Sequence, residues 1–173
     1  VMSNASIDNV VTSGTFSLDG GTWDVDNNVW IVGDDSEVYI IDAAHNAEAI
    51  AEAVGNRRVK GILATHGHSD HIDAAPELSR LVDAPVYLHP TDGFLWQRQN
   101  PSAHYRQLLD GATFTIAGTD LRVMSTPGHS PGSSVIHLPE AKVLFSGDTL
   151  FQGGPGATGR SYSSFPTIIA SIT

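Results

Sequence analysis

Short apolar runs, separated by glycine, aspartate and proline, recur along the chain and predict a protein rich in β-strands. Antiparallel strands are expected at residues 15–18, 29–32 and 37–41, since Asp19-Gly20-Gly21 and Gly33-Asp34-Asp35 supply turn residues between them. The continuous apolar runs at 59–64 and 84–88 predict buried strands. A second set of strands is expected at 113–116, 120–124, 133–138 and 142–145.

Helices are expected in fewer places. Asn46 is a suitable N-cap for a helix over residues 47–54, in which Ile50 and Val54 lie four apart on one face. A second helix is expected over 74–82, and the polar stretch 91–111 has no clear pattern. Residues 164–172 read as the opening of a helix, with Pro166 in its first turn and no stop signal after it.

Length and composition favour one globular domain. We divide the chain into an N-terminal segment, 1–14, in which Ser3-Asn4-Ala5 resembles a tag remnant, and a single domain, 15–173. The start lacks the pattern of a signal peptide, so a cytoplasmic protein is expected. No apolar run approaches the roughly 20 residues that span a membrane, and without cysteine there is neither a disulfide nor a thiolate ligand.

The net charge of −10 restricts the partners. Nucleic-acid binding needs lysine and arginine side chains to neutralise phosphates, and this chain has only nine such residues, scattered along its length. The group Arg57-Arg58-x-Lys60 reads as a solvated helix end. We therefore expect a small-molecule substrate and neither nucleic acid nor membrane as partner; the sequence gives no indication of the oligomeric state.

A histidine-rich loop directly after the run at 59–64 carries the strongest chemical signal. It reads His66-Gly67-His68-Ser69-Asp70-His71. In extended backbone His66 and His68 project to the same side and can reach one cation, whereas Asp70 and His71 follow on a turning chain and are aimed towards a neighbouring ion. Imidazole and carboxylate are suitable ligands for zinc, iron or manganese.

Two later fragments share this layout of a strand followed by a glycine-containing loop. His129 lies in Thr126-Pro127-Gly128-His129-Ser130-Pro131-Gly132-Ser133, and Asp148 lies in Ser146-Gly147-Asp148-Thr149. Taken alone, His129 is as well explained by a structural role, and Asp148 by a turn cap. Because strand ends of one sheet converge, we expect both to join the first cluster.

These three motifs, in this order, resemble the metallo-β-lactamase superfamily and most of all its glyoxalase II-like hydrolases. The resemblance implies an α+β fold of four layers, an αββα sandwich. It also implies that His66, His68 and His129 hold a first metal, and that Asp70 and His71 hold a second, with Asp148 bridging both. Asp42 matches an acidic position behind the ligands in the family, and a helix or turn cap explains it equally well.

The chain departs from the family pattern in one respect. The family supplies a last histidine to the second metal well after the Gly-Asp-Thr motif, and no histidine follows Asp148 here. We therefore expect a C-terminally incomplete domain that lacks the last strand, the last helix and one ligand.

Two adjacent cations would supply hydroxide at neutral pH, polarise a carbonyl group and stabilise a leaving group. The resemblance implies hydrolysis of an ester, thioester, lactone or amide, with a thioester favoured, two zinc ions in a complete site, and iron or manganese as alternatives. Asp70 would orient the nucleophile and shuttle a proton. Arg160 and Tyr162 are candidate substrate contacts in a glycine-rich wall, and His45, in the loop after Asp42, either lines the pocket or faces water.

Two other functions stay open. Persulfide dioxygenase-like relatives hold one iron with positions that match His66, His129 and Asp148, which would make the protein an oxidoreductase. Truncation would instead leave a metal-binding fragment without activity. The metal that purifies with the protein separates the first alternative from a zinc hydrolase.

Overall fold

The computed structural model describes residues 5–173 and contains a six-stranded sheet. Its strands, in spatial order, are β1 (Ser6–Leu18), β2 (Gly21–Gly33), β3 (Glu37–Ile41), β4 (Arg58–Leu63), β5 (Val86–Leu88) and β6 (Arg106–Gln107). Strands β1, β2 and β3 pair antiparallel, whereas β3 to β6 pair parallel. Parallel strands need crossover connections, and helices supply them between β3 and β4 and between β4 and β5.

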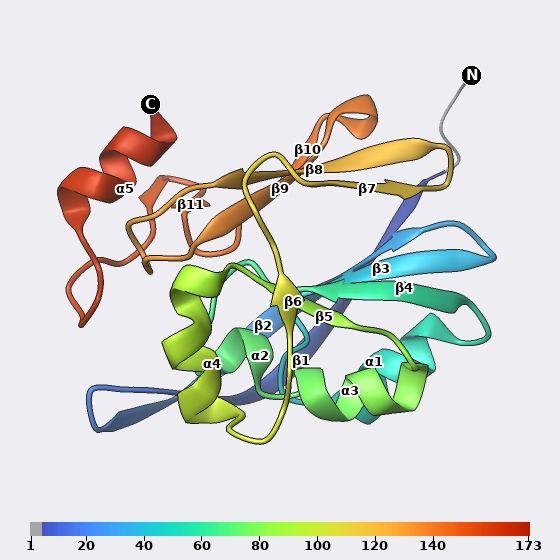
Figure 1. Cartoon of the computed structure of the whole chain (residues 1–173), viewed down its shortest axis with the longest axis horizontal. Coiled ribbons are helices and arrows are strands. Elements are labelled where there is room, and N and C mark those ends of the chain that lie inside the picture. Colours follow the sequence, from blue (N-terminus) through green and yellow to red (C-terminus); the bar gives the residue numbers. More distant parts are fainter. Residues whose placement is uncertain (1–4) are drawn as a thin grey trace.

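A four-stranded antiparallel sheet lies against the first (Figure 1). Its strands are β10 (Val143–Phe145), β9 (Ser134–Leu138), β8 (Thr119–Ser125) and β7 (Thr113–Ile116). A short hairpin of β11 (Leu150–Phe151) and β12 (Gly154–Pro155) follows, and a 3₁₀ turn, Pro139–Ala141, connects β9 to β10. The second set of strands expected from the sequence is thus confirmed.

Helices cover the outer face of the six-stranded sheet (Figure 1). They are α1 (Ala47–Val54), α2 (Ser69–Ile72), α3 (Ala75–Val82) and α4 (Gly93–Gln99), with a 3₁₀ turn, Pro90–Asp92, before α4. Asn46 caps α1 as predicted, accepting a hydrogen bond from the backbone of Ala49. The helix α4 lies within residues 91–111, where no clear pattern was found. Trp96 anchors it, because its buried ring packs in the core and its Nε1 donates to the carbonyl of Ala103.

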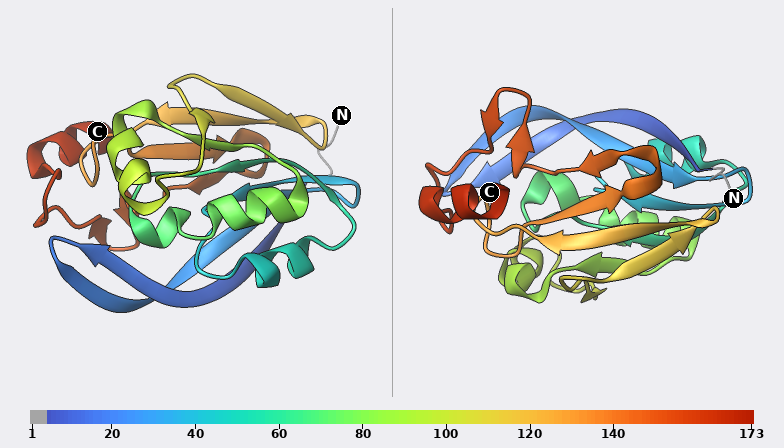
Figure 2. Two further views of the ribbon diagram at one scale, coloured as in Figure 1. Left: turned by 60° about the horizontal axis from the view of Figure 1, so that its bottom comes forward. Right: turned by 90° about the horizontal axis from the view of Figure 1, so that it is seen from above.

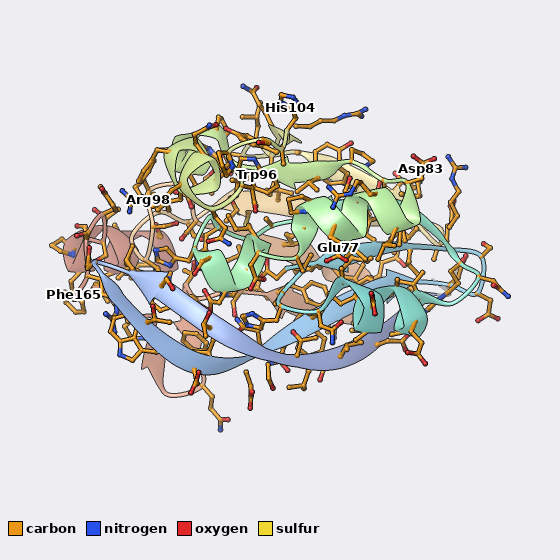
Figure 3. All side chains as sticks on the ribbon, turned by 90° about the horizontal axis from the view of Figure 1, so that it is seen from below. Glu77, Asp83, Trp96, Arg98, His104 and Phe165 are labelled. Atoms are coloured by element: carbon orange, nitrogen blue, oxygen red, sulfur yellow. The ribbon has the colours of Figure 1, made fainter. Side chains whose placement is uncertain are left out.

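The last helix, α5 (Phe165–Ile172), forms where the sequence predicted the opening of a helix. Ser164 caps it, and Ile168 is its buried residue. Figure 2 shows α5 and the β11–β12 hairpin at the same end of the molecule as the tip of the β1–β2 hairpin. In Figure 3 Phe165 lies at that end, while His104 projects from the edge of the molecule, consistent with a surface role.

Alternation along β3 builds two apolar cores. Val38 and Ile40 face the helices, whereas Tyr39 and Ile41 face the second sheet. Successive side chains of a strand point to opposite faces, so one short strand contributes to both cores. The six-stranded sheet is therefore buried on both sides at its centre.

The layers seen are helices, sheet and sheet, as expected for the first three layers of the sandwich. Among residues 5–173, no helix lies across the outer face of the four-stranded sheet (Figure 1), where Met124 and Leu144 are exposed. Residues 5–173 include no helix that is both long and apolar enough to cross a membrane.

The N-terminal boundary expected from the sequence was too late. Strand β1 begins at Ser6 and pairs with β2 along its whole length, so residues 6–14 belong to the domain. Alternation of mostly polar residues hid this strand, because its outer face is exposed to water. The suggested tag remnant includes Ser3 and Asn4, which lie outside the described residues.

A buried carboxylate, that of Asp92, joins the two halves of the fold next to the histidine loops. Asp92 is fully buried and accepts hydrogen bonds from the backbone N–H of Gly67 (2.8 Å) and Gly132 (2.6 Å) and from the hydroxyl of Ser130 (2.6 Å). Gly132 must be glycine, because a Cβ there would lie 2.7 Å from the Asp92 carboxyl carbon. Asp92 thus holds the loop after β4 against the loop after β8.

Replacing Asp92 by alanine is expected to lower the free energy of unfolding by about 2–5 kcal/mol, because three buried donors would lose their acceptor. Urea unfolding measures this loss. Asp8→Ala is the control, since it removes a carboxylate that makes only an exposed ion pair with Arg57, for which about 0–1 kcal/mol is expected. Equal small losses in the two variants would show that Asp92 does not connect the halves.

Candidate metal centre

The histidines converge because the ends of strands from both sheets meet at one edge. Strand β4 ends at Leu63, and His68, five residues later, precedes α2 in an extended conformation with φ −65° and ψ 147°. Asp70 and His71 then lie in the single turn of α2. The loop after β8 brings His129, and the loop after β10 brings Asp148.

Three imidazoles form the first group. Ligand atoms of His66, His68 and His129 lie within 4.8 Å of one another. Nδ1 of His68 lies 3.0 Å from Nε2 of His129. All three side chains are buried, and Nε2 of His66 has no hydrogen-bond partner.

The carboxylate of Asp148 lies between this group and a second one. Its Oδ2 is 3.6 Å from Nε2 of His66, 3.3 Å from Nε2 of His129 and 3.3 Å from Nε2 of His71. His66, His71 and Asp148 form a second set of side chains spaced closely enough to bind a cation. The structure therefore brings Asp148 to a shared position between the two groups.

Hydrogen bonds on the outer side of the rings fix which nitrogen points inward. Nδ1 of His71 donates to Oδ2 of Asp42 at 2.8 Å, and Nδ1 of His129 donates to the carbonyl of Ala157 at 2.7 Å. In each ring, Nε2 is left facing the centre. Outer partners of this kind set the tautomer and orientation of metal-binding histidines.

Asp42 acts through these contacts rather than as a turn cap alone. It is buried, has φ +61°, and accepts hydrogen bonds from both the N–H (2.7 Å) and the hydroxyl (2.8 Å) of Thr65. A non-glycine residue at positive φ is strained, and such strain persists where the surroundings impose it. Asp42 thus fixes the start of the histidine loop and the ring of His71 together.

Asp70 presents one free oxygen. Its Oδ2 accepts a hydrogen bond from Nδ2 of Asn27 at 3.0 Å, whereas its Oδ1 is buried without a partner. A buried carboxylate oxygen without a partner is costly unless a cation or a proton donor satisfies it. Asp70 therefore has an atom available for the centre.

The protonation states suit cation binding at the first group. Burial lowers the pKa of His68 to about 3 and also places the pKa of His66 well below its usual value, so both rings are neutral. Burial also opposes a charge on His71, but the carboxylates of Asp148 and Asp42 outweigh it and raise the pKa of that ring. Burial acts to raise the pKa of Asp148, yet His71 and the other rings hold it far below its usual range, so Asp148 is ionised.

These features fit a divalent metal. Neutral imidazole nitrogens and an ionised carboxylate are the donors that zinc and iron prefer, and a cation would satisfy the free Nε2 of His66 and the free Oδ1 of Asp70. The residues present therefore provide a complete set of donors for one metal and three further donors, on His71, Asp148 and Asp70, beside it.

Two cavities open beside Asp148. One, of about 470 Å³, is lined by Asn27, Asp42, His71 and Asp148 together with apolar residues of β10. The other, of about 180 Å³, is lined by Phe16, His68, Asp70, His129 and Arg160 among others. Reacting groups of a small molecule can thus approach Asp148 from two sides.

Of the two substrate contacts suggested by the sequence, the structure places one at the cavity. Arg160 lines the smaller cavity, and its guanidinium lies 4.0 Å from the ring centroid of Trp23. Tyr162 is half exposed, makes an edge-to-face contact with Phe94, with ring centroids 4.7 Å apart, and lines neither cavity at Asp148. A contact between Tyr162 and the substrate stays a prediction.

Sequence reasoning missed Asn27 and Asp92. Asn27 lies in a strand about forty residues before Asp70, and Asp92 lies in a stretch without a motif, so no local spacing connects either to the centre. For His45 the sequence left two alternatives open, a place in the pocket wall or exposure to water. Its side chain is in fact buried and contacts Asn27 and Asp73.

Comparison with known proteins agrees with this geometry. A probable metallo-hydrolase of Bacillus subtilis, YqgX, is 31% identical over 84% of this chain and 76% of its own length. The hydroxyacylglutathione hydrolase GloC of Haemophilus influenzae is 31% identical over 80% of this chain and 73% of its own length. The crystal structure of TTHA1623 in a di-iron-bound form superposes with a TM-score of 0.73 and 29% identity, covering 84% of this chain and 78% of that one.

The family profile gives the same result over most of the chain. The profile described as the metallo-beta-lactamase superfamily matches residues 22–172, which include all three histidine and aspartate motifs. The resemblance inferred from those motifs is thereby confirmed. The chain belongs to the metallo-beta-lactamase superfamily.

Proposed function

We propose that this protein is a metal-dependent hydrolase that cleaves an acyl bond, with a thioester as the favoured substrate. The observation that carries the proposal is the position of Asp148 Oδ2, within 3.3–3.6 Å of Nε2 atoms of His66, His71 and His129. His66, His68 and His129 would hold one metal, and His71 and Asp70 a second, with Asp148 shared. Bound there, the metals lower the pKa of water to near neutrality and polarise the substrate carbonyl.

The side chains around this centre prepare the reaction. Asp70 lines the smaller cavity, and its buried Oδ1, which has no partner, is available to orient an attacking water and to take up its proton. Asp42 and the carbonyl of Ala157 hold the rings of His71 and His129 in one orientation. Because these groups are fixed before substrate arrives, little reorganisation is needed during the reaction.

The smaller cavity supports a thioester with a negative charge at one end. Phe16 and Val25 give it apolar walls, and Arg160 provides a cation that makes no ion pair with any other residue of 5–173. A thioester acyl chain fits the apolar part, and a carboxylate fits the guanidinium. The similarity to GloC, named a hydroxyacylglutathione hydrolase, also supports a thioester as the bond that is cleaved.

A mononuclear iron oxidoreductase is the second candidate. The observation that favours it is that His66, His129 and Asp148, the two histidines and one carboxylate such a site needs, lie together in the structure. Elemental analysis of the purified protein, with assays for thioester hydrolysis and for oxygen consumption with persulfides, separates the two functions. Iron alone with oxygen consumption and no hydrolysis would overturn the hydrolase proposal.

Metal titration is expected to show two ions with different affinities. In the first group His66 and His68 bind as neutral rings, whereas binding at His71 must displace the proton that the surrounding carboxylates keep on its ring. Since the folded-state pKa of His71 is raised, a higher pH removes this competition. The affinity of the weaker site should therefore rise more steeply with pH, as calorimetric titration with zinc on both sides of neutrality would show; equal pH dependence at both sites would contradict the assignment of His71.

Asp148→Asn should lower the metal content and reduce turnover by at least about 100-fold while the fold survives, because the shared negative charge is lost without a change of size. Metal analysis, circular dichroism and a thioester assay measure the three properties. Asp24→Asn, an exposed aspartate of the β1–β2 hairpin, is the matched control and should change none of them. Unchanged metal content and turnover in Asp148→Asn would rule out the shared position.

Arg160→Ala should raise KM for a thioester that carries a carboxylate by roughly 10–100-fold, the value of one charge-assisted hydrogen bond, with a smaller effect on kcat. A thioester of similar size without the carboxylate serves as the control substrate, and its KM should stay the same. An equal rise for both substrates would mean that Arg160 only supports the Trp23 side of the cavity.

A further inference from the structure

A partly buried polar chain of four side chains leads from the surface to the candidate metal centre. Oδ2 of Asp73 lies 2.7 Å from Nδ1 of His45, whose Nε2 lies 2.8 Å from Oδ1 of Asn27. Nδ2 of Asn27 then donates to Oδ2 of Asp70 at 3.0 Å and lies 3.4 Å from Nε2 of His71. The chain connects α2, the loop after β3 and the middle of β2.

The carboxylate of Asp70 determines the direction of the hydrogen bonds that Asn27 makes. The Asp70 carboxylate can only accept, so the amide of Asn27 must turn its NH₂ group towards it. The Oδ1 of Asn27 therefore accepts from Nε2–H of His45. Rotating the amide group by 180° would break both hydrogen bonds. His45 and Asp70 together therefore fix the orientation of the Asn27 side chain.

The surroundings are shaped to hold His45. Its side chain is 2% exposed, its φ is +65°, and its backbone N–H donates to Oδ1 of Asp73 at 2.6 Å. Gly14 on β1 must be glycine for the ring to fit, because a Cβ there would lie 2.3 Å from Nδ1 of His45. The strained backbone of His45 and the missing side chain at Gly14 thus both allow the ring of His45 to occupy this position.

We propose that Asn27, held in place by His45 and Asp73, is a positioning residue for Asp70. By engaging Oδ2 of Asp70, which lies 3.5 Å from Nε2 of His71, Asn27 holds this carboxylate beside the second group and leaves its buried Oδ1 without a partner. The inference rests on the proposed metal-dependent function, because this orientation would offer the carboxylate of Asp70 to the second metal. Side chains that orient metal ligands typically change metal affinity when they are removed.

The test is a titration of the metal-free protein with Zn²⁺ by calorimetry and with Co²⁺ by visible absorption. Asn27→Ala removes the contact at a partly exposed position, and His45→Phe keeps a ring of similar size without its nitrogens. Both should weaken the second ion by about 10–100-fold and alter the second Co²⁺ spectrum, while the first ion binds as before.

The control is Thr12→Val, which removes a buried hydrogen bond, 2.7 Å long, to the carbonyl of Ala44, next to His45. It should lower the melting temperature and leave both affinities unchanged. Wild-type affinity for the second ion in Asn27→Ala would overturn the positioning role, as would an equal loss in Thr12→Val. Should His45→Phe fail to fold, Asn27→Ala alone decides.

Failure of the proposed function is separately visible. A wild-type protein that binds no metal overturns both the hydrolase proposal and this inference. One that binds a single ion overturns the inference and leaves the hydrolase proposal to the activity assay. Two bound ions with Asn27→Ala unchanged overturn the inference alone.

Discussion

The buried carboxylate of Asp92 is the contact on which the centre depends. Histidines from two sheets can share a cation only if the loop after β4 and the loop after β8 stay at a constant separation. Neither loop belongs to a strand, so strand pairing does not set this separation. Asp92 binds the backbone of Gly67 between two of the histidines and binds Ser130 and Gly132 beyond the third. Hydrogen bonds to a charged acceptor are stronger than neutral ones, so one side chain holds both loops.

Three carboxylates contact the histidines in different ways. Asp42 binds the outward-facing Nδ1 of His71. Asp148 lies close to the Nε2 atoms of His66, His71 and His129. Asp70 accepts a hydrogen bond from Asn27 at one of its oxygens. Burial keeps His66 and His68 neutral, whereas the carboxylates favour a proton on His71. The two halves of the centre are thus chemically unequal, although they share Asp148.

The β1–β2 hairpin has a larger role than its polar sequence suggests. It pairs along its full length, supplies Asn27 to the polar chain behind Asp70, and places Phe16 and Trp23 beside Arg160. Its tip also contacts the segment after β12, where Ser161 N–H donates to Asp19. The hairpin therefore forms one wall of the site and part of its support.

The sequence by itself determined the family, most strands, the helices α1, α3 and α5, and the convergence of six ligand candidates, because periodicity and short motifs are local signals. Asp92, Asn27 and the state of His45 were decided only by the tertiary structure. Their partners lie between 18 and 43 residues away in the chain, so no spacing reveals them. Whether a polar side chain is a surface group or a buried connector depends on which distant elements pack around it.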